Sequence, residues 1–205
     1  MAKGMEGGVK IIVGLGNPGP QYQQTRHNVG FRALELLAER LGVPFDREKY
    51  QAQLAECRYG QQRLILVKPL TFMNNSGAAV AKIARNTLRG PEDLLVATDD
   101  VELPLGRVRF RPAGSSGGHN GLKSVIAHLG TRDFPRLRMG VGKEPEQGGL
   151  VGHVLGKFRP EEWPEVDAML GRAVDGILRF LEDGVETAMN EFNCKPNPAS
   201  NREAT

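Results

Sequence analysis

The sequence predicts an α/β fold: a single domain with a mixed, mostly parallel sheet and helices on both faces. Short apolar runs that suit buried strands alternate with segments of helical periodicity. Polar or glycine-rich loops follow several of these strands, and ligands bind at such strand ends in open α/β sheets. A hairpin pattern around Gly60 indicates that the sheet is not all parallel.

Length and composition limit the domain organisation, the kind of partner and the location that we expect for this chain. The 205 residues can bury one full core, and we expect a flexible N-terminal segment at 1–10, the α/β domain at 11–193 and a polar tail at 194–205. The small excess of 27 Lys and Arg over 24 Asp and Glu permits a polyanionic partner without demanding one. Cys57 and Cys194 form neither a zinc pattern nor a disulfide framework, so we expect a cytoplasmic location. We also expect no signal peptide and no membrane span.

The first strand, Ile11 to Val13, is β-branched throughout and leads into the loop GLGNPG. Glycines let a backbone approach a ligand closely, and Asn17 among them carries both a donor and an acceptor. The loop also satisfies the glycine fingerprint of dinucleotide-binding folds. However, the polar run that follows Pro20 postpones the helix, and no acidic residue stands at the end of a second strand. An NAD(P)-dependent oxidoreductase is therefore a minority alternative.

The middle of the chain repeats the pattern of strand, polar loop and helix. A first helix, which Thr25 or Asn28 could cap, stops at Gly42. Strand-like runs at 51–59 and 63–67 form the hairpin, and the second leads to TFMNNSG, where Asn75 or Ser76 can cap another helix. The next strand, 94–100, ends in carboxylates.

The strand at 106–111 alternates strictly, which places Arg107, Arg109 and Arg111 on one face. This row of cations either binds nucleic-acid phosphates, which we favour, or is a solvated edge that prevents strand pairing. A glycine-rich loop then leads into a short helix that ends at Gly130. A core strand at 137–141 and a helical pattern at 161–192, interrupted near Gly184, complete the domain.

The loops at the strand ends carry a set of residues that suits direct hydrolysis by water. No GxSxG, HExxH or Walker sequence is present, so serine hydrolysis, zinc proteolysis and nucleotide hydrolysis lack their usual signals. A histidine with an aspartate partner is the minimum for activating water, and asparagine amides can donate to the oxygen of an attacked carbonyl. The candidates are Asn17, His27, Asn74, Asp99, His119 and Asn120.

Four motifs in this order and spacing resemble bacterial peptidyl-tRNA hydrolase: GLGNPGPQYQQTRHNVGF, TFMNNSG, TDDVELPLG and GSSGGHNGLKS. The resemblance runs from about Ile11 to Phe192. It implies an enzyme that cleaves the ester between a peptide and the terminal ribose of tRNA after premature release of peptidyl-tRNA, without a metal or cofactor. We expect peptidyl-tRNA as the partner, no membrane contact, and a monomer.

The same resemblance implies a role for each site residue. His27 is the general base, and Asp99 is the carboxylate that orients it. Asn17 and Asn74 hold the peptide and carbonyl groups of the substrate near the ester. Asn120 helps to place the water and the tRNA end.

Two further groups of residues are carried over by motif. Tyr22 and Met73 line the peptide channel, and four cations contact tRNA phosphates: Arg109, Arg111, Lys123 and Arg138. Many relatives have His-Asp-Glu where this chain has Thr98, Asp99 and Asp100, so the setting of the carboxylate is altered.

Each assignment has a structural alternative. His27 could merely cap the first helix, and Met73 could be simple core. Asparagines are common cap and turn residues, which is the role we prefer for Asn28 and Asn75. His119 is expected to be structural.

We expect His128 and His153 to lie on the surface. A non-catalytic RNA-binding module on the same fold is the second functional alternative, although the complete His, Asp and Asn set argues against it.

Overall fold

A seven-stranded mixed sheet forms the centre of the computed structural model, which describes residues 8–143 and 149–194. The strand order is β2-β3-β4-β1-β5-β7-β6. Neighbours β4, β1, β5 and β7 run parallel, whereas β2, β3 and β6 are antiparallel to their neighbours. The strands are β1 (Val9–Gly14), β2 (Arg47–Lys49), β3 (Ala52–Tyr59), β4 (Gln62–Pro69), β5 (Leu94–Asp100), β6 (Val108–Arg111) and β7 (Arg136–Gly140).

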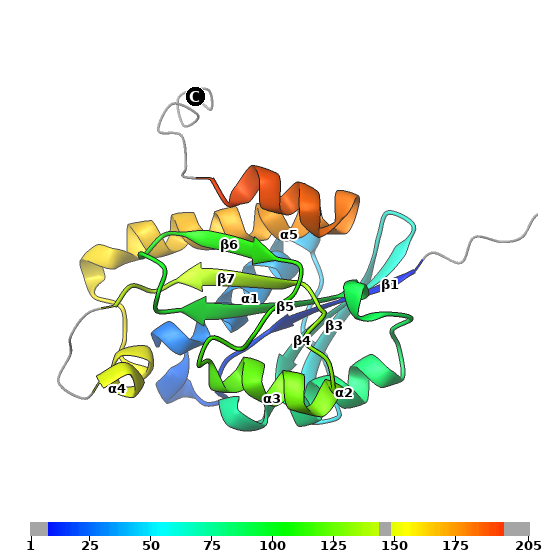
Figure 1. The fold of residues 1–205 in the computed structure, drawn as a ribbon, viewed down its shortest axis with the longest axis horizontal. Helices are drawn as coiled ribbons and strands as arrows, with labels where there is room; N and C mark the ends of the chain where they lie inside the picture. Colours follow the sequence, from blue (N-terminus) through cyan, green and yellow to red (C-terminus); the bar gives the residue numbers. More distant parts are fainter. Residues whose placement is uncertain (1–7, 144–148, 195–205) are drawn as a thin grey trace, which may run out of the picture.

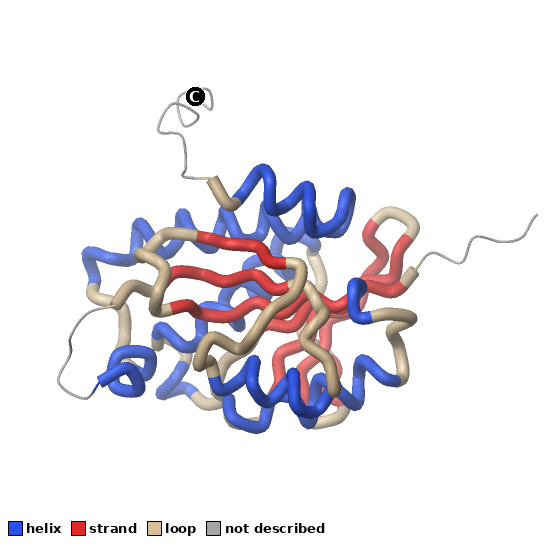
Figure 2. Tube along the Cα trace, viewed as in Figure 1, coloured by secondary structure: helices blue, strands red, loops and turns tan. Residues whose placement is uncertain are grey.

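Helices cover both faces of this sheet, which confirms the predicted fold class (Figures 1 and 2). The α-helices are α1 (Val29–Leu41), α2 (Ser76–Arg85), α3 (Asn120–Leu129), α4 (Gly149–Leu155) and α5 (Trp163–Phe192). Short 3-10 turns join them: η1 (Pro20–Tyr22), η2 (Arg26–Asn28), η3 (Met73–Asn75), η4 (Pro91–Asp93) and η5 (Pro160–Glu162). Among these helices, none is both long and apolar enough to cross a membrane.

The apolar run of β1 divides between two core clusters because successive strand side chains point to opposite faces. Ile12 packs in the cluster formed with α1 and α5. Ile11 and Val13 pack in the other cluster, with α2 and α3. The sheet is therefore buried on both faces, as its continuous β-branched sequence predicts.

The carboxyl ends of the parallel strands bring the candidate residues to one edge of the sheet. The loop after β1 holds Asn17, the turn after β4 holds Met73, and β5 ends with Asp99 and Asp100. The short helix α4 lies beyond the ends of β5 and β7 (Figure 1). This edge is the location that the sequence predicts for a site.

Gly30 allows α1 to begin in direct contact with this edge. A Cβ atom there would lie 2.4 Å from the backbone oxygen of Leu15 and 2.7 Å from that of Ala97. We expect Gly30→Ala to lower the free energy of unfolding by about 1–3 kcal/mol, because backbone atoms cannot yield as a flexible side chain can. Urea unfolding would measure the change. Gly171→Ala in α5, where nothing lies within 4 Å of the added carbon, is the control and should not destabilise the fold.

Some predicted boundaries need correction. Val9 and Lys10 belong to β1 rather than to a flexible segment, because Val9 pairs with Arg63 and Lys10 Nζ lies 2.6 Å from Asp93 Oδ1. Gly8 is also described, and its backbone oxygen accepts from the N–H of Arg63 at 3.1 Å. Residues 1–7 of the predicted segment, and the predicted tail apart from Cys194, lie outside the described residues.

The predicted elements omit one strand and one helix, and the predicted position of one histidine is wrong. The strand β2 and the helix α4 have no counterpart in the predicted elements. His153 was predicted to be a surface residue but is 1% exposed, because its Nε2 lies 2.9 Å from the backbone oxygen of Gly142 and attaches α4 to the end of β7.

Candidate active site

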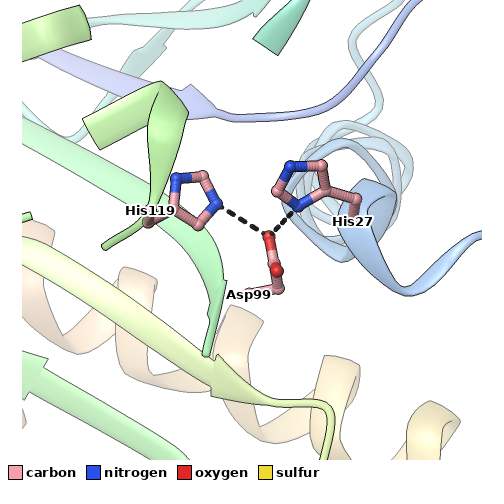
Figure 3. Close-up of side chains that lie close together, drawn as sticks. All are labelled: His27, Asp99 and His119. Carbon is pink, nitrogen blue, oxygen red and sulfur yellow. Dashed lines mark hydrogen bonds and ion pairs between the residues drawn. The ribbon is translucent and has the colours of Figure 1, made fainter. Parts of the chain in front are cut away.

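His27 and Asp99 meet at the centre of the candidate site (Figure 3). His27 lies on η2 and Asp99 lies near the end of β5, and His27 Nδ1 is 2.8 Å from Asp99 Oδ1. Because Nδ1 faces a carboxylate oxygen, we assign its proton to that nitrogen, which leaves the lone pair on Nε2. His27 also lines a pocket of about 170 Å³, so a water there could lose a proton to Nε2.

The Asp99 carboxylate is buried and accepts from two histidines. Burial by itself raises the pKa of Asp99, but the attraction and hydrogen bonds of His119 and His27 outweigh burial and hold that pKa well below its usual range. The carboxylate therefore stays ionised near neutral pH. An ionised partner stabilises the imidazolium that forms when His27 takes a proton.

His119 is oriented by its neighbours as a hydrogen-bond donor to Asp99. Its Nδ1 accepts from the backbone N–H groups of Gly121 at 3.1 Å and Leu122 at 3.2 Å, which caps α3. Its proton is therefore on Nε2, which lies 2.9 Å from Asp99 Oδ1 and 2.6 Å from Thr98 Oγ1. Both nitrogens are engaged, so His119 does not compete with His27 as a base. The contact between the Thr98 hydroxyl and His119 is part of the altered surroundings of the Asp99 carboxylate that the sequence predicts.

His27, Asp99 and His119 form a cluster of residue types that can bind a metal ion. Their candidate ligand atoms lie within 4.8 Å of one another. A metal ligand needs a free lone pair, whereas Nε2 of His119 and Nδ1 of His27 both carry the protons that bind Asp99. The donor set therefore fits a hydrogen-bonded network better than a metal centre.

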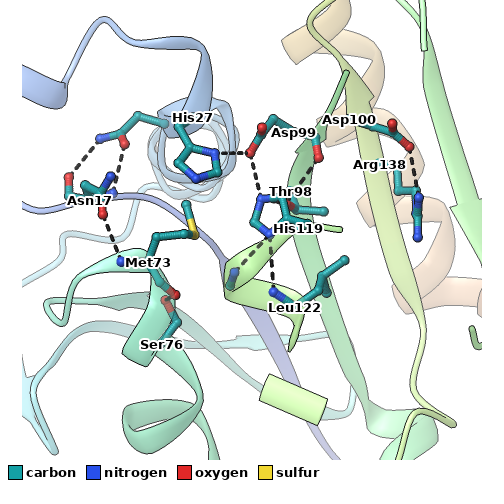
Figure 4. A network of polar contacts seen from close by, with 12 residues as sticks. Asn17, His27, Met73, Ser76, Thr98, Asp99, Asp100, His119, Leu122 and Arg138 are labelled. Atoms are coloured by element: carbon teal, nitrogen blue, oxygen red, sulfur yellow. Dashed lines mark hydrogen bonds and ion pairs between the residues drawn. The ribbon is translucent and has the colours of Figure 1, made fainter. Parts of the chain in front are cut away.

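Asn17 is fixed by two neighbours so that its amide group has one orientation (Figure 4). The backbone N–H of Asn17 donates to Asn28 Oδ1 at 2.9 Å, and Asn28 Nδ2 donates to the backbone oxygen of Asn17 at 3.0 Å. The N–H of Met73 donates to Asn17 Oδ1 at 2.8 Å. Within the described residues, Asn17 Nδ2 has no such partner, and Asn17 lines a second pocket rather than the one that His27 lines.

Asn28 is thus a functional neighbour that sequence reasoning misassigned as a helix cap. It occupies the N-cap position of α1 but makes no side-chain cap bond there. Asn75 likewise makes no side-chain cap bond at the start of α2.

The remaining substrate candidates lie around the site to different extents. Asn120 is exposed at the start of α3 and lines the pocket with His27. Met73 is 5% exposed and packs in the core against Gly121, beside His119. Tyr22 is half-buried in η1 and Asn74 is exposed in η3, and neither lines the pocket that holds His27.

One wall of this pocket comes from α4, which the sequence did not predict. Leu150, Val151 and Val154 line the pocket together with residues of the loop that carries His119. Leu150 is 53% exposed and Val151 is 64% exposed, so apolar surface faces the site. The helix has only seven residues, too few for a helical period to stand out.

Two of the predicted tRNA contacts lie on one face of the edge strand β6. Val108 and Phe110 are buried in the core cluster that contains α5, so Arg109 and Arg111 point to the opposite face. The predicted alternation is therefore present. Arg107 leaves the row, because its Nη2 donates to the backbone oxygen of Asn193 at 3.0 Å.

The other two residues predicted to contact tRNA phosphates, Lys123 and Arg138, lie in different surroundings. Lys123 is exposed on α3. Arg138 is opposite Arg109 in the pairing of β6 with β7, but its guanidinium already bonds Asp100 Oδ2 at 3.1 Å and the backbone oxygen of Ser115 at 3.1 Å. Arg138 therefore also supports the glycine-rich loop and lines the pocket beside Asp99.

Arg136 is a buried residue of the site region that the sequence did not single out. Its guanidinium donates to the backbone oxygen of Gly114 at 2.7 Å and to that of Arg132 at 2.7 Å. Arg136 thus joins the loop before α3, which contains Gly114, to the turn before β7, which contains Arg132. Burial first, and then repulsion from Arg138, lowers its pKa to about 10, so it stays charged near neutrality. This linking role follows from the backbone oxygens that surround the guanidinium in the fold, and no local sequence pattern indicates it.

Comparisons with a family model, with curated proteins and with solved structures all point to the same family. Residues 11–201 match a family model described as peptidyl-tRNA hydrolase. A peptidyl-tRNA hydrolase of Akkermansia muciniphila is 47% identical over 192 residues, which are 94% of this chain and 100% of that protein. One of Synechococcus sp. strain JA-3-3Ab is 50% identical over 188 residues, which are 90% of this chain and 83% of that protein. The crystal structure of a mutant peptidyl-tRNA hydrolase from Acinetobacter baumannii has a TM-score of 0.85 at 34% identity and covers 94% of this chain and 98% of that one.

Proposed function

The chain belongs to the peptidyl-tRNA hydrolase family, and from this premise we propose that it hydrolyses the ester between a peptide and the terminal ribose of tRNA, with His27 as general base. The observation that carries the proposal is the 2.8 Å contact between His27 Nδ1 and Asp99 Oδ1. It leaves Nε2 of His27 as the acceptor at the pocket.

The reaction follows from these positions in two proton transfers. A water molecule gives a proton to His27 Nε2 as its oxygen attacks the ester carbonyl, and Asp99 stabilises the imidazolium. Asn17 Nδ2 donates to the oxygen on which negative charge develops, an interaction typically worth about 3 kcal/mol. The carbonyl then re-forms, the ester bond to the ribose breaks, and His27 returns the proton to the departing ribose oxygen. The products are the free peptide acid and tRNA.

The activity itself is tested by release of the blocked amino acid from an N-acetylated aminoacyl-tRNA. We expect release by the wild-type protein, with no loss after treatment with EDTA, because the steps above use protein side chains and water. Binding of tRNA without release would contradict the proposal and favour the RNA-binding module.

For tRNA binding, we predict that Arg109 and Arg111 contribute through phosphate charges. Arg109→Gln with Arg111→Gln should weaken tRNA binding and reduce the slope of log affinity against log salt by about 1.4–1.8 if each contacts one phosphate. Cleavage of a minimal ester substrate should stay nearly unchanged. Filter binding across a salt series would measure both effects.

A matched control removes two arginines from the other edge of the sheet, Arg47→Gln on β2 with Arg58→Gln on β3. This control should leave the salt slope almost unaltered. An equal loss in both double variants would show that overall charge, rather than the β6 face, attracts tRNA.

The oxidoreductase alternative finds little support in the loop geometry. After the glycines the chain forms η1 and η2, and α1 begins only at Val29. No helix N-terminus therefore starts at the last glycine of the fingerprint, where a pyrophosphate would bind. A thermal shift with NAD or NADP would reopen this alternative. The monomeric state and the cytoplasmic location remain predictions.

A further inference from the structure

Arg26, the residue before His27, is buried although it carries a full charge. It is 1% exposed, and its Nη2 donates to Glu162 Oε2 at 3.0 Å. Its guanidinium carbon lies 4.7 Å from the centre of the Phe158 ring. Arg26 therefore joins η2, which carries His27, to the segment in front of α5.

That segment, residues 156–162, is called the strap, and it contacts η2 and its N-cap residue at two further points. The backbone N–H of Arg26 donates to the oxygen of Gly156 at 3.0 Å, and Thr25 forms a β-bridge with Lys157. Glu162 Oε2 also accepts from the backbone N–H of Arg159 at 2.6 Å. One carboxylate oxygen thus binds both the strap and the arginine next to His27.

The turn η2 needs such external support. It has three residues, and its N-cap Thr25 makes no side-chain cap bond. Short 3-10 turns have poor hydrogen-bond geometry and seldom hold their shape alone. The direction of the His27 side chain therefore depends on what is packed around η2.

Stability alone is a weak explanation for a buried arginine at this position. Within the described residues, Nε and Nη1 of Arg26 are buried without a hydrogen-bond partner. Burying a charge is costly, and apolar replacements of buried ion pairs are often as stable as the pair. An exact orientation of the neighbouring histidine is a benefit that an apolar side chain would not supply.

We propose that Arg26 and Glu162 are positioning residues that hold η2 so that His27 Nδ1 meets Asp99 Oδ1. This inference rests on the proposed role of His27 as base. It assigns to the buried ion pair an effect on the rate of the chemical step rather than on substrate binding.

The test uses the full chain and three variants of the ion pair: Glu162→Gln, Arg26→Lys and the double variant Arg26→Met with Glu162→Gln. For the double variant we expect kcat to fall on the order of 10- to 100-fold, because small misplacements of a catalytic group have effects of this size. KM should stay within about twofold, since neither side chain lines the pocket. Arg26→Lys, which keeps the charge, should retain more activity than the double variant.

A second readout separates positioning from stability and from the proposed function. Proton NMR without substrate should show a downfield Nδ1–H resonance of His27 in the wild type, and this resonance should broaden or vanish in the double variant. Ile83→Ala in α2, a core substitution far from the strap, is the control: it should lower Tm but leave the resonance and kcat intact.

A resonance that persists unchanged in the double variant would overturn the proposal, whatever happens to kcat. Because this spectrum needs no substrate, it stays decisive even if His27→Ala proves active and the proposed function fails.

Discussion

His27→Ala is expected to slow release of the N-acetylated amino acid from its tRNA by about 10²- to 10⁴-fold, the usual contribution of a general base. Without the imidazole, the water in the pocket has no acceptor for its proton. Affinity for tRNA should change little, because the proposed phosphate contacts lie on β6, β7 and α3. Single-turnover kinetics with excess enzyme would measure the chemical step, and filter binding would measure affinity.

The matched control for this variant is His128→Ala. His128 is an exposed histidine in the last turn of α3, and its Nδ1 lies 2.9 Å from the backbone oxygen of Ser124. Its loss should leave kcat within about twofold of the wild type. A folded His27→Ala variant with wild-type kcat would refute the assignment of the base.

Asp99→Asn should cost about 10²- to 10⁴-fold in kcat although it keeps the shape of the side chain. An amide can present its NH₂ group to His27, which would move the imidazole proton to Nε2. The histidine would then face the water as a donor instead of an acceptor. Asp100→Asn is the control, because Asp100 binds Arg138 and the backbone N–H of Glu102 rather than His27.

The lowered pKa of Asp99 adds a dependence on pH to this comparison. A carboxyl whose pKa is lower in the folded state contributes stability above its unfolded pKa of about 3.9 and loses it as the pH falls toward the folded value. The difference in free energy of unfolding between the wild type and Asp99→Asn should therefore be larger at pH 7 than at pH 3. Urea unfolding at both values would test this, and an unchanged difference would contradict it.

The sequence predicts those parts of the fold that local pattern determines. The β-branched run of β1, the hairpin at Gly60 and the break of α5 at Gly184 each have a local cause, and the structure contains all three. By contrast, α4 has seven residues, and its attachment to the domain depends on the contact between His153 and the backbone just after β7. No local pattern encodes a contact of that kind.

The candidate site shows the same division. Its loops could be predicted because polar residues follow strands in the sequence, and motif resemblance selected His27 and Asp99. The residues that support the site could not be predicted, because arginine is usually exposed and asparagine usually caps a turn. Arg26 and Arg136 are buried, and Asn28 holds Asn17, only because distant segments meet.

The measurement that tests the central claim most directly is a double-mutant cycle between His27 and Asp99. Single-turnover rates would be compared for the wild type, His27→Ala, Asp99→Asn and the double variant on N-acetylated aminoacyl-tRNA. If Asp99 acts only through His27, the double variant is as slow as His27→Ala and no slower. Losses that multiply would contradict the account, because they would show that the two residues act independently.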